Sequence, residues 1–182
     1  KVLLVAINAK YIHSNLAVYS LLRYAQERIG QRDIEIEIAE YTINNRIDEI
    51  IPDIYKRKAD VLAFSTYIWN VGDIVKLCEN IKKVKPNTII ALGGPEVSYD
   101  SKNAMEKYPF VDYILYGEGE LVFRDLVMHL QDNKNIEDVE GIVYRSNGQV
   151  VVNRPKELLQ NLDEIPSPYE NLDPKEYENR IV

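Results

Sequence analysis

The sequence of 182 residues has few side chains that bind metals or form cross-links, with one cysteine and two histidines. One cysteine cannot form a disulfide within the chain, and it cannot alone hold a zinc ion or an iron–sulfur cluster. No apolar run approaches the ~18 residues that a membrane-spanning helix needs, and the first residues lack the features of a signal peptide. We therefore expect a cytoplasmic protein with no membrane span and no metal site among these residues.

The chain also lacks an excess of positive charge. It has 22 Lys and Arg residues against 29 Asp and Glu residues, which gives a formal net charge of −7. A protein that binds the phosphate backbone usually carries a basic face, so we expect no nucleic-acid partner. The 46% hydrophobic and 28% charged content is typical of a globular domain with a real core.

Short apolar runs alternate with helical patterns along most of the chain. Five such runs begin 25 to 32 residues apart, at residues 2–7, 34–39, 61–65, 88–92 and 113–116. Apolar residues at helical spacing lie between them, as in Val18, Leu21, Leu22 and Ala25. This alternation predicts an α/β fold with a parallel sheet covered by helices on both faces.

The pattern within the strands predicts their order. Residues 2–7 are all apolar, as in a strand buried on both faces, whereas residues 34–38 alternate, as in an edge strand. A flavodoxin-like (Rossmann-like) five-stranded sheet of order 2-1-3-4-5 has the first strand inside and the second at the edge. Ligands of such sheets bind beyond the carboxyl ends of the strands, at the switch point between strands one and three.

The pattern changes after the last predicted helix. Two strand-like runs flank Asn147-Gly148, a pair that favours a β-hairpin. Residues 154–182 contain four of the eight prolines and no sustained period, which is typical of a linker or strap. We expect an α/β domain at 1–139, a hairpin appendage at 140–153 and a linker at 154–182.

Four loops should meet at the carboxyl edge of the sheet, at residues 8–15, 65–70, 93–99 and 116–120. The first has no glycines to hold a dinucleotide pyrophosphate, and no P-loop motif occurs in the chain. Ser65 stands where a response-regulator receiver needs an acceptor aspartate. These three kinds of site are therefore disfavoured.

Each of the remaining loop features has a structural alternative to ligand binding. Gly93 and Gly94 would let a bulky ligand lie on the backbone, or they form a tight strand-to-helix turn. Hydroxyls follow the third strand, where Asn70 competes to cap the next helix. Gly117 or Gly119 could offer an amide at a helix N-terminus, whereas Glu118 and Glu120 equally suit the first helical turn.

Three longer motifs, taken in order, resemble a known family. They are Val2-Leu3-Leu4-Val5-Ala6, Leu92-Gly93-Gly94-Pro95-Glu96 and Val111-Asp112-Tyr113-Ile114-Leu115-Tyr116-Gly117-Glu118-Gly119-Glu120. The chain resembles the N-terminal cobalamin-binding domain of cobalamin-dependent radical S-adenosylmethionine enzymes. That group includes the anaerobic magnesium-protoporphyrin ester cyclase.

The resemblance implies cobalamin as the cofactor, held over the carboxyl edge, with its nucleotide tail near Ser65 and the paired glycines. No residue of this chain is then expected to be catalytic. The cofactor-binding residues that we expect are Asn8, Tyr11, His13, Ser65, Thr66, Tyr67, Gly93, Gly94, Pro95, Tyr116, Gly117 and Glu118.

Many cobalamin domains carry Asp-x-His-x-x-Gly after the first strand, and its histidine binds cobalt. Here residues 10–15 keep His13 but lack the aspartate and the glycine. His13 therefore has no evident carboxylate to orient it. We expect no protein histidine on the lower face of cobalt, where Tyr11 or another loop residue would lie instead.

The family also uses S-adenosylmethionine and an iron–sulfur cluster, which is bound by a Cys-x-x-x-Cys-x-x-Cys run that these residues lack. The resemblance places both in a radical domain that would follow the linker, as this chain's partner. Two other interpretations stay open. One is a cofactor-free flavodoxin-like module for domain contact or substrate presentation, and the other is a small-molecule enzyme with Glu96 or Glu118 as base.

Overall fold

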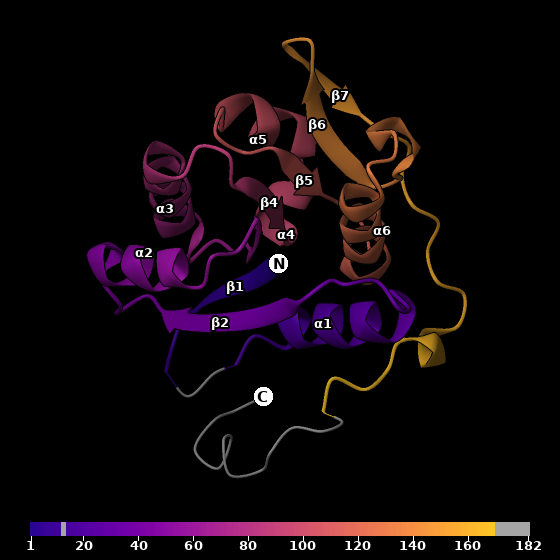
Figure 1. Ribbon diagram of the computed structural model, residues 1–182, viewed down its shortest axis with the longest axis horizontal. Coiled ribbons are helices and arrows are strands. Elements are labelled where there is room, and N and C mark those ends of the chain that lie inside the picture. The colour runs from indigo at the N-terminus through magenta and orange to yellow at the C-terminus, as the bar shows by residue number, and fades with distance from the viewer. Residues whose placement is uncertain (12–13, 170–182) are drawn as a thin grey trace.

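A mixed seven-stranded sheet crosses the molecule in the order β2-β1-β3-β4-β5-β6-β7 (Figure 1). This computed structural model describes residues 1–11 and 14–169. The strands are β1 (Val2–Asn8), β2 (Ile36–Thr42), β3 (Val61–Ser65), β4 (Ile89–Gly93), β5 (Tyr113–Leu115), β6 (Ile142–Ser146) and β7 (Gln149–Val152).

The first five strands are parallel and follow the predicted order 2-1-3-4-5. All seven residues of β1 are buried, whereas six of the seven residues of β2 are half-buried at the sheet edge. The sequence pattern of each strand therefore reflects its place in the sheet: the apolar β1 is central, and the alternating β2 is at the edge.

The prediction of five strands was wrong in one respect, because the hairpin continues the sheet. β6 pairs antiparallel with β5, with Tyr113 opposite Tyr144. β5 has only three residues, and pairing satisfies backbone groups that an open edge would leave exposed. The turn itself is as predicted, since Asn147 and Gly148 both have positive φ, 49° and 78°.

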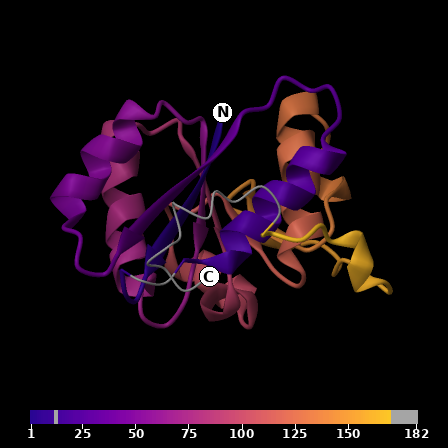
Figure 2. The same cartoon turned by 90° about the horizontal axis from the view of Figure 1, so that it is seen from below.

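Helices cover both faces of the sheet (Figure 2). α1 (Leu16–Arg28) and α6 (Gly119–Asp132) pack on one face. The other face carries α2 (Ile47–Lys56), α3 (Val71–Val84), α4 (Pro95–Ser98) and α5 (Ser101–Lys107). Two short 3₁₀ turns follow at Ile136–Asp138 and Leu162–Glu164. No helix within residues 1–11 and 14–169 is long and apolar enough to cross a bilayer.

The chain beyond β7 returns along α6 and α1 as a strap, which we define as residues 153–165 (Figure 1). Gly141 N donates to Arg154 O at 2.8 Å. Lys156 Nζ lies 2.9 Å from Asp125 Oδ2 and 3.1 Å from Glu140 Oε2. These contacts fasten the beginning of the strap to the folded domain.

Candidate ligand-binding pocket

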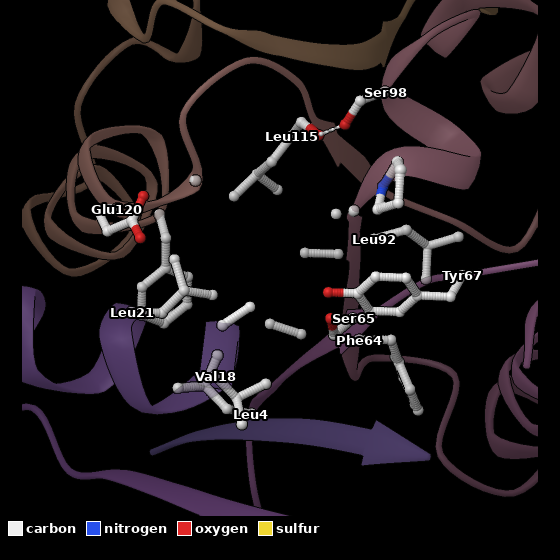
Figure 3. Close-up of a pocket in the computed structure, with 18 of the residues that line it drawn as sticks. Leu4, Val18, Leu21, Phe64, Ser65, Tyr67, Leu92, Ser98, Leu115 and Glu120 are labelled. Atoms are coloured by element: carbon white, nitrogen blue, oxygen red, sulfur yellow. Dashed lines mark hydrogen bonds between the residues drawn. The ribbon is translucent and has the colours of Figure 1, made fainter. Parts of the chain in front are cut away.

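A pocket of about 300 Å³ opens at the carboxyl edge of the sheet, between β1, β3, β4 and the helices α1 and α6 (Figure 3). Its position is where parallel sheets of this order bind ligands. The residues that line it are Leu4, Ala17, Val18, Leu21, Ala63, Phe64, Ser65, Tyr67, Ala91, Leu92, Gly93, Gly94, Pro95, Ser98, Leu115, Gly117, Gly119, Glu120 and Phe123.

The pocket exists because small residues occupy the sheet beneath the two helices. Ala63, Ala91 and Gly93 contribute little volume, so the helices cannot fill the space above them. A Cβ atom built on Gly93 would meet only one atom within 4 Å, Leu115 Cβ at 3.8 Å. Position 93 is thus open toward the pocket, and a larger side chain there would occupy ligand space.

Gly94 is required for a different reason. Its φ is +105°, and a Cβ atom there would lie 2.4 Å from Thr66 O, far inside van der Waals contact. The Thr66 hydroxyl donates to Gly93 O, and Thr66 N donates to the same oxygen at 2.7 Å. Thr66 is fully buried and joins the ends of β3 and β4 without lining the pocket. Gly94 therefore allows the close packing of two loops.

A network of polar side chains supports the pocket hydroxyl of Ser65. Asn15 Nδ2 donates to Ser65 Oγ at 3.2 Å, and Asn15 N donates to Glu40 Oε1 at 3.0 Å. Glu40 also accepts from Asn8 Nδ2 at 2.9 Å and from the Tyr19 hydroxyl at 2.7 Å. Glu40 on the edge strand thereby ties β1 and the start of α1 to the pocket.

Asn70 connects the ends of β1 and β3. It stands at the N-cap position of α3, as the sequence suggested, but its side chain makes no capping bond. Instead Nδ2 donates to Ile7 O and to Ser65 O, both at 3.0 Å, and Oδ1 accepts from Tyr67 N at 2.7 Å. Because Asn70 is fully buried, these three bonds hold the switch point in place.

Aromatic side chains stand at the pocket rim. The rings of Tyr67 and Trp69 stack with centroids 4.4 Å apart and an interplanar angle of 10°. Figure 3 shows the Tyr67 hydroxyl pointing into the pocket. Trp69 is 47% exposed and the neighbouring Ile68 is 79% exposed. The rim thus offers flat apolar surface beside a polar group.

Six of the twelve expected site residues line the pocket: Ser65, Tyr67, Gly93, Gly94, Pro95 and Gly117. Asn8 and Thr66 support the pocket through the hydrogen bonds given above. Tyr11, on the first loop, is 70% exposed. His13 lies outside the described residues.

Tyr116 and Glu118 do not line the pocket, and both contact the strap instead. The Tyr116 hydroxyl donates to Asn153 O, and burial raises its pKa. Glu118 Oε2 accepts from Leu159 N at 2.9 Å. Glu96, the other carboxylate considered as a base, is also absent from the lining. The structure therefore gives no support to acid–base chemistry by this pair at the pocket.

The expected site residues did not include those that α1 and α6 contribute to the pocket. Val18, Leu21 and Phe123 fit apolar helical stripes and were interpreted as core, Glu120 was interpreted as a first-turn residue suited to the helix dipole, and Ala17 gave no signal. All five lie in the first two turns of α1 or α6, next to the carboxyl edge. This position next to the carboxyl edge is the sequence signal that could have identified them. Within the described residues, no group of three or more His, Cys, Asp and Glu side chains could hold a metal ion.

Comparison with known proteins assigns this fold and pocket to a family. A family model described as "B12 binding domain" matches residues 2–127, which include every residue that lines the pocket. The chain belongs to the B12-binding domain family.

Relatives of this B12-binding domain are much longer proteins. It is 38% identical over 111 residues to "Cobalamin-dependent radical SAM methyltransferase TokK" of Streptomyces tokunonensis, covering 60% of this chain and 16% of that protein. It is 30% identical over 104 residues to "Anaerobic magnesium-protoporphyrin IX monomethyl ester cyclase" of Synechocystis sp., covering 57% of this chain and 21% of that protein.

A solved structure shares the fold of this B12-binding domain. The cobalamin-dependent S-adenosylmethionine radical enzyme OxsB, with aqua-cobalamin and S-adenosylmethionine bound, aligns with a TM-score of 0.74 at 22% identity. The alignment covers 91% of this chain and 24% of the OxsB chain. The chain thus corresponds to about a quarter or less of these three relatives.

Proposed function

We propose that this domain binds cobalamin, with the nucleotide tail in the pocket and the corrin ring over the carboxyl edge of the sheet. The observation that carries the proposal is the apolar pocket at the switch point, opened by Gly93 and bordered by the Ser65 hydroxyl. Membership of the B12-binding domain family supports the choice of ligand.

The size of the pocket agrees with this division of the cofactor. About 300 Å³ is at the lower end of the ~300–1,000 Å³ of small-molecule sites. A corrin ring with its substituents and nucleotide is too large for that space, whereas a flat aromatic base can enter it. The walls on which such a base would pack are apolar, with Val18, Leu21 and Phe123 from the helices.

Ser65 supplies the polar contact that a base nitrogen needs. Its oxygen already accepts from Asn15 Nδ2, so its own hydrogen is available to donate into the pocket. A ring nitrogen acting only as acceptor would satisfy that donor. Tyr67 and Trp69 then offer a flat surface at the rim, suited to contact with the corrin system.

When bound, cobalamin supplies a cobalt centre that can carry a methyl group. In our proposal the chain binds and orients the cofactor and contributes no catalytic residue. We also propose that no histidine of this chain binds the lower face of cobalt, because the loop around His13 lacks the aspartate and glycine of the histidine-binding motif.

For the whole protein we propose a cobalamin-dependent radical S-adenosylmethionine enzyme, as TokK and OxsB are described. S-adenosylmethionine and the iron–sulfur cluster would be bound by a separate radical domain, which residues 154–182 would join to the B12-binding domain at 1–139 and its hairpin at 140–153. We propose the cytoplasm as location, and the net charge of −7 favours no nucleic-acid partner.

Retention of cobalamin by the purified protein tests the proposal. We expect the protein to stay coloured after incubation with hydroxocobalamin and passage through a desalting column. Gly93→Leu should abolish retention because the side chain fills the pocket. Gly72→Leu is the matched control, since position 72 on α3 is also open but lies outside the pocket. A colourless wild-type protein would refute cobalamin binding by this domain and favour the cofactor-free interaction module.

A further inference from the structure

One carboxylate lines the otherwise mostly apolar pocket. Glu120 lies in the first turn of α6, and Figure 3 shows it on the opposite side of the pocket from Ser65 and Tyr67. Ser20 of α1 donates its hydroxyl to Glu120 Oε1 at 2.7 Å. Ser20 is 9% exposed, so this bond is shielded and holds the carboxylate in one orientation.

The second oxygen of Glu120 has no hydrogen-bond donor among residues 1–11 and 14–169. An ionised carboxylate is an acceptor with room for several donors. Water can satisfy this oxygen in the open pocket, but a ligand that fills the pocket displaces that water. Leaving a charged acceptor unpaired next to Leu21 and Phe123 would then oppose binding.

We infer that Glu120 is a specificity-determining residue that accepts a hydrogen bond from a donor on the nucleotide tail. The inference rests on the proposed cobalamin site. The donor is a ribose hydroxyl, because the base nitrogen that is not bonded to the ribose can only accept, and the anionic phosphate must face away from Glu120. Ser65 donates on one side of the pocket and Glu120 accepts on the other, so together they fix which way the tail enters.

A purely structural role for Glu120 makes a different prediction. A Glu in the first turn of a helix interacts favourably with the helix dipole, and the Ser20 bond joins α1 to α6. If the role were purely structural, Glu120→Gln would alter the free energy of unfolding but not the preference between ligands. Glu96→Gln is the matched control, because Glu96 is also in a first helical turn, of α4, and does not line the pocket.

The test compares two ligands that share the corrin ring, aquacobalamin and cobinamide, of which cobinamide lacks the nucleotide. We expect Glu120→Gln to weaken aquacobalamin binding ~10-fold in a spectroscopic titration, because a charge-assisted hydrogen bond becomes a neutral one. The Kd for cobinamide should change less than ~2-fold. Ser20→Ala should weaken aquacobalamin binding ~3-fold, and Glu96→Gln should leave both constants unchanged.

Each other outcome has a defined meaning. Unchanged or tighter binding of aquacobalamin by Glu120→Gln overturns the inference, and so does an equal loss for both ligands. If cobinamide binds neither the wild type nor Glu120→Gln, all measurable affinity comes from the nucleotide tail. A loss of affinity for aquacobalamin in Glu120→Gln then still supports the inference. If the wild-type protein binds no aquacobalamin, the proposed function itself fails, which the titration of the wild type shows separately.

Discussion

At the scale of single residues, the adjacent glycines at the end of β4 have separable roles. Gly94 avoids a backbone clash with Thr66, whereas Gly93 leaves space for a ligand. We expect Gly94→Ala to lower the free energy of unfolding by ~2–4 kcal/mol, through φ strain and the clash. Gly93→Ala should change it by less than ~1 kcal/mol but weaken cobalamin binding. Urea unfolding and ligand titration measure both effects, and equal effects of the two variants on both quantities would contradict this assignment.

Asn70 offers a second test at this scale. Asn70→Ala removes the side-chain hydrogen bonds to two carbonyl groups and one amide in a fully buried place, so we expect a loss of ~2–4 kcal/mol in unfolding free energy. Asn70→Asp should cost at least as much, because a carboxylate would face the oxygens of Ile7 and Ser65. Asn80→Ala is the control, since its amide makes one exposed bond on the same helix. Chemical denaturation measures the free energy of unfolding. A loss for Asn70→Ala no larger than for Asn80→Ala would contradict the role of Asn70 in joining β1 and β3.

At the scale of elements, the strap depends on a small ionic cluster. Lys156 is 21% exposed and bridges Asp125 of α6 and Glu140. We expect Lys156→Met, which keeps the apolar stem, to increase amide exchange throughout residues 153–165, including the Leu159 amide held by Glu118. Hydrogen–deuterium exchange by mass spectrometry measures this.

Lys83→Met serves as control for the strap, because Lys83 is 62% exposed and pairs only within α3. It should leave exchange in the strap unchanged. Unchanged protection in Lys156→Met would mean that the backbone bonds of the strap suffice to hold it.

Much of the element layout could be predicted because the signals are local. The wholly apolar β1, the alternating β2 and the Asn147-Gly148 turn each report burial or backbone conformation within a few residues. The pairing of the hairpin with β5 could not be predicted, since two strands of one hairpin carry no information about their third neighbour.

The side-chain contacts in the walls of the pocket could not be predicted for a related reason. Ser20 and Glu120 meet although they are 100 residues apart in sequence. Val18 and Phe123 have the spacing of ordinary core residues, and only the small residues beneath them turn a core contact into a cavity. Loop residues such as Ser65 and Gly93 were found because the strand order alone places them at the carboxyl edge.

At the scale of the whole molecule, Arg32 joins the segment after α1 to the end of α6. Its Nε and Nη2 donate to Asp132 at 3.1 and 3.0 Å. Hydrogen bonds from Arg32, and from Lys134, lower the pKa of Asp132 to about 2. Because the folded pKa is below the unfolded value of ~3.9, the stabilisation is complete above that value and is lost as the pH falls toward 2.

We therefore expect Asp132→Asn to lower Tm at pH 7 but to match the wild type near pH 2. Thermal unfolding followed by circular dichroism across this range measures the difference. Asp33→Asn, at an exposed neighbouring aspartate, should leave Tm unchanged at both ends. A Tm difference for Asp132→Asn that stays constant from pH 7 to pH 2 would contradict the ionic origin.

The lone cysteine gives the protein an intrinsic reporter of cooperativity. Cys78 is fully buried against the sheet face opposite the pocket, and burial raises the pKa of its thiol, so a thiol reagent reaches it only when this core opens. A ligand at 100 times its Kd should slow labelling ~100-fold if both faces of the sheet open together. A labelling rate of Cys78 that does not change with ligand would instead show that the two faces of the sheet unfold as separate units.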